Sequence, residues 1–201
     1  CGRNNPRNDK YLQWNLEYIK DKDQQDQAWF GQESKVEEIE VEVMHSQVST
    51  TSIYALHSVS SGNYIDGRNP NHLGNEVHMT NRPPKNDKYL QWYFEPMGHN
   101  KVAIRSVSSG NYLDGRARGM TGDTLFLTKR NPEGDKFLHW YVEDLGHGKV
   151  AFRSVSSDLY LDGRNPEHRG GHQIWLCGRN NPRNDKYLQW NLEYIKDKDQ
   201  Q

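Results

Sequence analysis

The sequence has few cysteines, no excess of either charge and no long apolar run. The two cysteines, Cys1 and Cys177, occupy the same position in two copies of one segment, so a disulfide framework is not expected. The 26 Lys and Arg and the 27 Asp and Glu give a formal net charge of -1, which leaves no electrostatic footprint for nucleic acids or anionic membranes. No apolar stretch approaches about 18 residues, so no membrane span is predicted.

The start of the chain and its hydropathy set further bounds. The first residue is Cys1 rather than methionine and no signal peptide is visible, so we expect a processed product, a fragment or an engineered sequence. Apolar residues make up 33% and the mean hydropathy is -1.08, which indicates a polar surface and a small core. We expect a soluble protein whose cysteine usage is compatible with the cytoplasm, although nothing in the sequence names a compartment.

Three segments between the ends repeat one another with few gaps: residues 54–101, 102–149 and 150–198. Each repeat contains four short stretches in which apolar and polar residues alternate, separated by turn residues. In the second repeat these stretches are VAIRSV, NYLDG, TLFLTK and KFLHWYVEDL. Period-two alternation predicts strands, and no segment shows a convincing helical period. The sequence therefore predicts an all-β fold of three four-stranded lobes.

Three lobes of four strands match a β-trefoil, in which six strands close a short barrel and three hairpins cap it. The tryptophans that recur on the fourth stretch, Trp92, Trp140 and Trp190, are expected in or near the core. The other positions expected in or near the core are Val59, Val107 and Val155; Tyr64, Tyr112 and Tyr160; and, in part, Ile65, Leu113 and Leu161. The repeated Gly67, Gly115 and Gly163 are expected in turns that need a positive φ.

The first 25 residues are identical to the last 25, CGRNNPRNDKYLQWNLEYIKDKDQQ. The C-terminal copy completes the third lobe, whereas the N-terminal copy contains only a fourth strand, Lys10–Ile19, and cannot fold as a lobe alone. A tandem array with a 176-residue period or an engineered duplication would explain the identity. We expect the C-terminal copy to fill the third lobe, because its connection is short, and the N-terminal strand to be able to dock into a neighbour as a swapped oligomer.

The predicted organisation has three parts. Residues 1–25 are the duplicate segment with its orphan strand, residues 26–52 are a linker or arm, and residues 53–201 form the β-trefoil. The arm contains KVEEIEVEV, whose alternation of apolar and acidic residues is typical of an edge strand. This strand either covers the outside of the barrel or serves assembly with another module.

Residues 53–198 resemble the β-trefoil superfamily, and within it the ricin B-type lectins and the fascin- and hisactophilin-like actin-associated trefoils. The lectin-like features of the second lobe are Leu113-Asp114, the stretch Gly122–Leu127 and the closing Trp140. The Gln-x-Trp signature of the lectins is not kept, since a leucine stands two residues before each of these tryptophans. The resemblance implies either glycan binding or binding to a protein such as actin.

A thrice-repeated Asp-Gly-Arg tripeptide is the candidate ligand site, because aspartate accepts hydrogen bonds from sugar hydroxyls and arginine donates them. The outward residue on the third strand differs between lobes, and its best stacking surfaces are Trp175 and then Phe126. The candidate ligand-binding residues are Asp66, Arg68, Asn69 and His78 in the first lobe; Asp114, Arg116 and Phe126 in the second; and Asp162, Arg164, Asn165 and Trp175 in the third. The alternative is a β-turn in which the aspartate caps the turn and the arginine pairs with a neighbouring lobe.

Other chemistries have little support. The nine histidines are scattered, and the pair His168 and His172 falls on a loop, so no metal site is predicted. No catalytic or cofactor motif is present, and Ser58-Val59-Ser60-Ser61 recurs in every lobe as a turn signature rather than a nucleophile. We expect neither an enzyme nor a cofactor.

The sequence thus favours a non-catalytic, lectin-like β-trefoil that binds glycans through up to three weak sites, whose repetition raises avidity. Two alternatives stay open. One is a fascin-like trefoil that binds a protein such as actin, and the other is a structural tandem-repeat or strand-swap protein.

Overall fold

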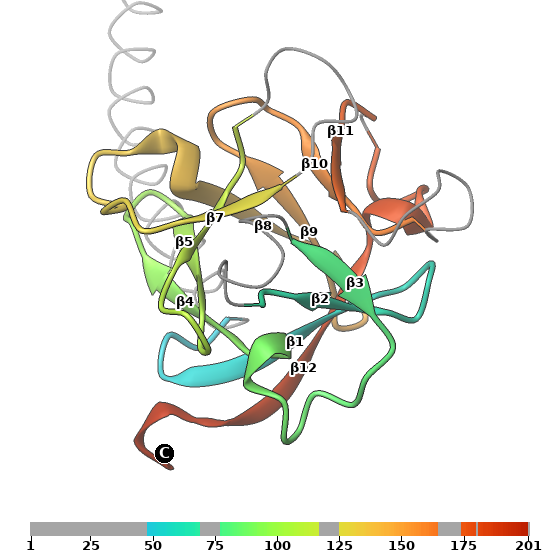
Figure 1. The fold of residues 1–201 in the computed structure, drawn as a ribbon. Helices are drawn as coiled ribbons and strands as arrows, with labels where there is room; N and C mark the ends of the chain where they lie inside the picture. Colours follow the sequence, from blue (N-terminus) through green and yellow to red (C-terminus); the bar gives the residue numbers. More distant parts are fainter. Residues whose placement is uncertain (1–47, 69–76, 117–124, 165–173, 180, 201) are drawn as a thin grey trace, which may run out of the picture. The chain divides into compact units, whose positions relative to one another are not determined.

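The computed structural model describes residues 48–68, 77–116, 125–164, 174–179 and 181–200, all within one compact unit, Met44–Gln201 (Figure 1). The N-terminal copy Cys1–Gln25, with its predicted strand Lys10–Ile19, and the predicted arm up to residue 47 lie outside the described residues. The described part is almost entirely β, and it contains no helix that is long and apolar enough to cross a membrane.

Twelve strands in the described residues fall into three lobes of four. The first lobe contains β1 (Ser52–Ser58), β2 (Tyr64–Asp66), β3 (His78–Thr80) and β4 (Trp92–Pro96). The second contains β5 (Lys101–Ser106), β6 (Tyr112–Asp114), β7 (Phe126–Thr128) and β8 (His139–Gly146). The third contains β9 (Lys149–Ser154), β10 (Tyr160–Asp162), β11 (Trp175–Cys177) and β12 (Trp190–Asp197). Short 3-10 helices, η1 (Lys88–Leu90), η2 (Lys136–Leu138) and η4 (Lys186–Leu188), precede the last strand of each lobe, and η5 (Lys198–Gln200) follows β12.

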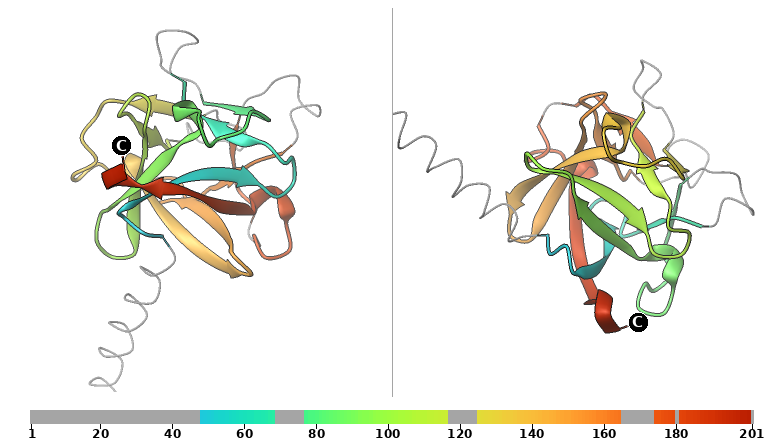
Figure 2. Two further views of the ribbon diagram at one scale, coloured as in Figure 1. Left: turned by 90° about the horizontal axis from the view of Figure 1, so that it is seen from below. Right: turned by 90° about the vertical axis from the view of Figure 1, so that its left-hand side faces the viewer.

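Six of these strands close a barrel (Figures 1 and 2). Antiparallel pairing runs from β1 to β4, β5, β8, β9 and β12 in turn, and then returns from β12 to β1. The other six strands form the hairpins β2–β3, β6–β7 and β10–β11, one in each lobe. This arrangement confirms the predicted β-trefoil.

The last strand of each lobe begins later than the sequence predicts. In the second lobe the stretch KFLHWYVEDL is predicted to be one strand, but its first three residues form η2 and β8 begins at His139. Asp135 caps this turn, because its Oδ1 accepts a hydrogen bond from the backbone N–H of Phe137 at 3.1 Å. The same aspartate cap precedes η1 and η4.

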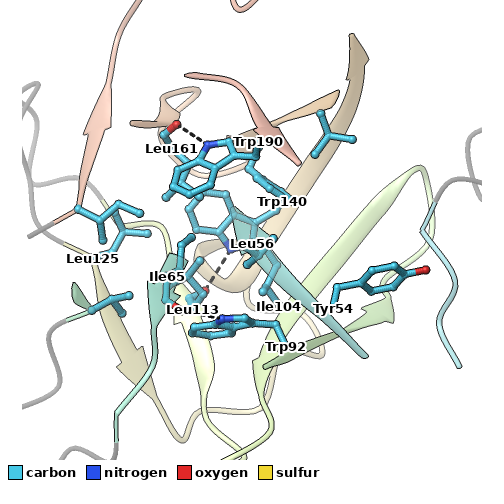
Figure 3. Packing of buried hydrophobic residues seen from close by; sticks show 14 of the residues in the cluster. Tyr54, Leu56, Ile65, Trp92, Ile104, Leu113, Leu125, Trp140, Leu161 and Trp190 are labelled. Atoms are coloured by element: carbon cyan, nitrogen blue, oxygen red, sulfur yellow. Dashed lines mark hydrogen bonds between the residues drawn. The ribbon is translucent and has the colours of Figure 1, made fainter. Parts of the chain in front are cut away.

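Three tryptophans form the centre of the core, as predicted. Trp92, Trp140 and Trp190 are fully buried in one hydrophobic cluster (Figure 3). Each indole Nε1 donates a hydrogen bond to the carbonyl oxygen of a buried residue on the second strand of its own lobe: Ile65 at 3.2 Å, Leu113 at 3.1 Å and Leu161 at 3.1 Å. A buried indole needs such a partner, and each bond ties a barrel strand to a hairpin.

Two other sets of residues expected in or near the core are partly buried, so they lie near the core rather than inside it. Val59, Val107 and Val155 lie one residue beyond the first strand of each lobe, and their backbone N–H groups bond to the adjoining lobe. The hydroxyls of Tyr64, Tyr112 and Tyr160 donate to glutamates, namely Glu193, Glu95 and Glu143. A position in a turn explains the first set, and a phenol that keeps a polar partner near the surface explains the second.

The repeated glycines serve close packing rather than a positive φ. Among the described glycines, those with a positive φ do not include Gly67, Gly115 or Gly163. A Cβ atom on Gly115 would lie 2.8 Å from Cζ2 of Trp140 and 2.7 Å from Oγ of Ser154, which is closer than real Cβ atoms approach. The predicted turn role is therefore wrong, because glycine here lets the tryptophan and the next lobe reach the backbone.

The C-terminal copy of the duplicated segment supplies the last strand of the third lobe, as predicted. β12 pairs with the full length of β1, from Ser52 opposite Asp197 to Ser58 opposite Trp190. It also pairs with β9, where Trp190 lies opposite Val150. β12 thereby closes the barrel between its first and third lobes.

Candidate functional site

The hairpins bring the predicted acceptor and stacking residues of each lobe together. Because residues that oppose each other in an antiparallel pair share one face, their Cβ atoms lie about 4.5–5.5 Å apart. The opposed pairs are Asp66 and His78 in the first lobe, Asp114 and Phe126 in the second, and Asp162 and Trp175 in the third. The predicted site residues Asn69 and Asn165 lie outside the described residues.

The aspartates of the Asp-Gly-Arg motif are buried and paired with arginines. Asp114 is 5% exposed, and it accepts hydrogen bonds from the backbone N–H of Arg116 at 3.0 Å and from its Nη2 at 2.7 Å. A second arginine, Arg130, donates from its Nη2 to the same carboxylate at 2.7 Å. A buried charge needs such partners, so the carboxylate holds two guanidinium groups in place.

The first lobe repeats this arrangement with fewer bonds to its motif arginine. Asp66 is 2% exposed, and its Oδ2 accepts from Nε of Arg68 at 2.7 Å and from Nη2 of Arg82 at 2.8 Å. Its Oδ1 has no hydrogen-bond partner in the described structure, and neither does the buried Nε2 of His78. Among the described residues, Oδ1 of Asp66 therefore has no donor, whereas Oδ1 of Asp114 accepts from the backbone N–H of Arg116.

In the third lobe the motif arginine makes most of the contacts. Asp162 is 1% exposed, and Arg164 donates to it from its backbone N–H at 3.0 Å, from Nε at 2.8 Å and from Nη2 at 2.5 Å. Nη2 of Arg164 also lies 3.8 Å from Sγ of the buried Cys177. Arg179 donates to Asp185 at 2.5 Å.

Sequence reasoning missed the second arginine of each lobe and the aspartate that caps the 3-10 helix. Arg130 forms an ion pair with Asp135 at 2.5 Å as well as with Asp114, so it joins the hairpin to η2. The equivalent residues are Arg82 and Asp87 in the first lobe and Arg179 and Asp185 in the third. The signal was visible in the sequence, because an arginine and an aspartate recur at these places in all three repeats.

An aromatic ring on the 3-10 helix lies against the arginines. The guanidinium carbons of Arg116 and Arg130 lie 5.2 and 5.7 Å from the centre of the Phe137 ring. Those of Arg164 and Arg179 lie 5.5 and 5.2 Å from the centre of the Tyr187 ring. These cation–π contacts and the carboxylates fix the guanidinium planes from two sides.

Hydrogen bonds to the aspartates stabilise the charged form of two motif arginines, Arg116 and Arg164. The hydrogen bond to Asp114 raises the pKa of Arg116, and the hydrogen bond to Asp162 raises the pKa of Arg164. Their N–H groups are therefore permanent donors. We call the set formed by the aspartate, its two arginines, the opposed third-strand residue and the 3-10 aromatic the Asp–Arg cluster of a lobe.

The stacking candidates differ in exposure. Phe126 is 38% exposed, and it lies opposite Asp114, the partner of Arg116. Trp175 and His78 are partly buried. Tyr89, the 3-10 aromatic of the first lobe, is also 38% exposed. Each cluster thus combines fixed N–H donors with an aromatic surface.

The glycine of each motif bonds to the next lobe, whereas the motif arginine bonds within its own lobe. The predicted alternative is therefore confirmed in one part and wrong in another. The aspartate caps the turn in the second and third lobes, where it accepts from the backbone N–H of Arg116 and Arg164, but the residue that pairs with the neighbouring lobe is the glycine and not the arginine. The carbonyl oxygen of Gly163 accepts hydrogen bonds from the hydroxyls of Ser58 at 2.7 Å and Ser60 at 2.9 Å. The equivalent locks join Gly67 to Ser106 and Ser108, and Gly115 to Ser154 and Ser156. The recurring Ser-Val-Ser-Ser stretch thus closes the ring of lobes.

Side chains that commonly ligate metals do not gather in the described residues. No group of three or more His, Cys, Asp or Glu that could hold a metal ion occurs there. Of the histidines weighed in the sequence as ligands, His168 and His172 lie outside the described residues.

The comparisons with known proteins agree with the fold. A family model described as a ricin-type beta-trefoil lectin domain-like family matches residues 42–125, which include the first lobe. No curated protein matches the sequence.

Solved structures match the β-trefoil fold over most of the chain. A designed threefold-symmetric protein, ThreeFoil, has 20% identity and a TM-score of 0.58, over 70% of this chain and 97% of that one. A ricin B-like lectin from Macrolepiota procera, solved with lactose, has 19% identity and a TM-score of 0.57, over 73% and 97%. An exo-beta-1,3-galactanase from Clostridium thermocellum has 21% identity and a TM-score of 0.59, over 74% of this chain and 31% of the enzyme. The chain is a β-trefoil protein.

Proposed function

We propose that this β-trefoil is a non-catalytic carbohydrate-binding module whose sites are the Asp–Arg clusters. The observation that carries the proposal is the second lobe, where the exposed ring of Phe126 lies directly opposite Asp114. Arg116 and Arg130 are held beside it by that carboxylate. An exposed ring and fixed polar groups on one face are what a sugar requires.

The chemistry of a pyranose matches the two halves of this surface. Its C–H face is apolar and packs on an aromatic ring, while its hydroxyls hydrogen-bond at the rim. The guanidinium N–H groups of Arg116 and Arg130 donate to those hydroxyls, and they lose little entropy because Asp114 and Phe137 already hold them.

The charge of the cluster favours a neutral sugar. In the second lobe, the two arginines are balanced by Asp114 and by Asp135. An acidic glycan would find no net positive charge there, so its carboxylate or sulfate would gain little from long-range attraction. We therefore place neutral oligosaccharides ahead of anionic ones.

The three clusters should not bind equally, because the residue opposite the aspartate changes. Trp175 in the third lobe and Phe126 in the second are the stronger stacking surfaces, and His78 in the first lobe is the weakest. Several weak sites on one chain raise avidity for a branched or repeated glycan.

The comparisons support this proposal at the level of the family. The matching family model is that of lectin-like trefoils, and the Macrolepiota procera structure is of a lectin with bound lactose. The galactanase and ThreeFoil share the fold at low identity, so they add support for the architecture alone.

The proposal is tested by titrating the full chain with neutral galactosides and glucosides while following its backbone amides by NMR. Phe126→Ala should weaken binding at the second lobe roughly 3- to 10-fold. Tyr194→Ala is the matched control, since Tyr194 is 55% exposed but lies on barrel strand β12 and contacts Tyr54. Equal affinities for wild type and Phe126→Ala would remove the second lobe as a site, and a folded chain that binds no sugar would contradict the function.

A further inference from the structure

The slot between β1 and β9 holds a segment that the chain carries twice. Residues 177–201 are repeated without change as residues 1–25, with an offset of 176 residues. The occupants of the slot, η4 and β12, and also the last residue of β11, all belong to this segment. The N-terminal copy therefore has the same side chains, in the same order, as those that hold the C-terminal copy in the slot.

The contacts of the seated copy show what any replacement must provide. Trp190 is fully buried, and its indole donates to the carbonyl oxygen of Leu161 at 3.1 Å. Asp197 accepts from Oγ of Ser52 at 2.9 Å, at the far end of the β1 pairing. In the N-terminal copy, Trp14 and Asp21 are the counterparts of these two residues.

The proximity of Lys198 to Thr51 makes the replacement geometrically simple. The seated copy ends beside the start of β1, because the backbone N–H of Lys198 donates to the carbonyl oxygen of Thr51 at 2.8 Å. Gln25, the end of the N-terminal copy, is separated from Thr51 by residues 26–50, which are 25 residues. A connection of this length closes between neighbouring points at an entropic cost that grows only with the logarithm of its length.

We propose that the slot between β1 and β9 is an exchange site, in which Cys1–Gln25 of the same molecule replaces Cys177–Gln201. A tethered copy acts at an effective concentration of the order of millimolar, so it outcompetes the copy of a second molecule in ordinary solutions. The exchange can reproduce the side-chain contacts that residues 177–201 make, because the replacing sequence is identical, and it releases the C-terminal copy from the slot. The inference is independent of the proposed sugar binding.

The first test removes the buried tryptophan from one copy at a time in the full chain. Trp190→Ala disables the seated copy, and Trp14→Ala disables the other one. If the N-terminal copy takes over, each single variant keeps most of the wild-type denaturation midpoint, whereas the double variant loses its cooperative transition. If Trp190→Ala unfolds as readily as the double variant, the exchange does not occur.

The second test measures directly whether the C-terminal copy is released from the slot. Cys177 is buried in the seated copy, so a Cys1→Ser chain should react slowly with a thiol reagent. Adding Trp190→Ala should make Cys177 react at the rate of a free thiol, while the thiol of the matching Cys177→Ser, Trp190→Ala chain becomes protected at Cys1. Slow reaction of Cys177 in the Trp190→Ala chain would overturn the proposal.

Sedimentation of the folded Trp190→Ala chain identifies the source of the replacing copy. A monomer at micromolar concentration is the expected result. A concentration-dependent dimer would overturn the same-molecule exchange, because a second molecule's Lys10–Ile19 strand would then fill the slot.

Discussion

Each residue of the Asp-Gly-Arg motif has a different role. The aspartate is buried, and it pairs with two arginines in the first and second lobes and with Arg164 in the third. The arginine lies against an aromatic ring in the second and third lobes, and the glycine carbonyl accepts hydrogen bonds from the next lobe. The contacts that hold the fold together therefore involve the same residues as the proposed binding site, and the sequence alone could not separate the two roles. The recurrence of the motif reflects the roles of all three residues.

Removing a motif aspartate should reduce stability as well as binding. Asp114→Ala leaves Arg116 and Arg130 without their shared carboxylate. We expect a loss of about 1–3 kcal/mol in the free energy of unfolding, below the 3–5 kcal/mol typical of fully buried pairs because both arginines are partly exposed. Chemical denaturation measures it, with the exposed Lys129→Ala as control. An unchanged midpoint would show that the ion pairs contribute nothing to the fold.

Two glycines of the second lobe should differ in how much stability is lost when they are substituted. Gly115→Ala places a Cβ 2.7 Å from Oγ of Ser154 and 2.8 Å from the Trp140 ring, and should lower stability by about 1–3 kcal/mol. Gly110→Asp should lower it by less than about 1 kcal/mol, since Asp158 holds the equivalent position in the third lobe with a φ of 60°. Thermal unfolding of the two variants measures both losses of stability. Equal losses would show that close packing at Gly115 is not what makes its substitution costly.

Tyr112 should titrate well above a free tyrosine. Burial, followed by its hydrogen bond to Glu95, raises its pKa to about 12. Because the folded pKa lies above the unfolded value of about 10, the stability that this hydroxyl contributes is complete below pH 10 and is lost as the pH rises through about 12. Difference absorbance of phenolate between wild type and Tyr112→Phe measures the pKa. A value near 10 would contradict the bond to Glu95.

At the scale of elements, the loop between the third and fourth strands of each lobe depends on one buried side chain. Nε2 of Gln91 donates to the carbonyl oxygens of Pro84 at 2.9 Å and Lys85 at 3.1 Å. In the second lobe His139 takes this place, with its Nε2 2.8 Å from the carbonyl oxygen of Pro132. The residue before each tryptophan therefore holds the preceding loop by a side-chain hydrogen bond, a role that the comparison with the lectin signature did not reveal.

This internal substitution gives a matched pair of variants. Gln91→Ala removes the side-chain donor from the carbonyl oxygens of Pro84 and Lys85, and the Pro84 oxygen then keeps only the backbone N–H of Asp87 at 3.2 Å. The variant should reduce the free energy of unfolding by about 1–3 kcal/mol. Gln91→His should recover most of that loss, as His139 does in its own lobe. Chemical denaturation of both variants provides the measurement. A histidine variant no more stable than the alanine variant would show that the bond to the loop is not what matters.

The elements that sequence reasoning placed correctly are those with a strong period. Alternation located the strands, and the tryptophans marked the core. The 3-10 helices were missed because Lys136–Leu138 continues the apolar pattern of the strand that follows, and only the capping Asp135 signals the turn. The arginine pairs were missed because nothing local indicates that Arg130 lies against Asp114, 16 residues earlier.

At the scale of the whole molecule, the threefold repeat made the β-trefoil predictable. Six strands close the barrel only if the last lobe meets the first, and β12 makes that closure along all of β1. The Gly163 lock to Ser58 and Ser60 fastens the same seam. The lobes share one architecture but differ in the residue opposite the motif aspartate, which is His78 in the first lobe and Phe126 in the second. The three surfaces therefore differ in their side chains.

Whether these surfaces bind neutral sugars is tested by probing a broad glycan array with the full chain. We expect binding to neutral glycans that falls sharply in a folded Phe126→Ala, Trp175→Ala double variant and persists in Tyr194→Ala. An array on which the folded wild-type chain binds nothing, or binds equally well after both aromatic substitutions, would contradict it. Either result would favour the alternative function, in which the trefoil binds a protein partner, as the fascin-like resemblance implies.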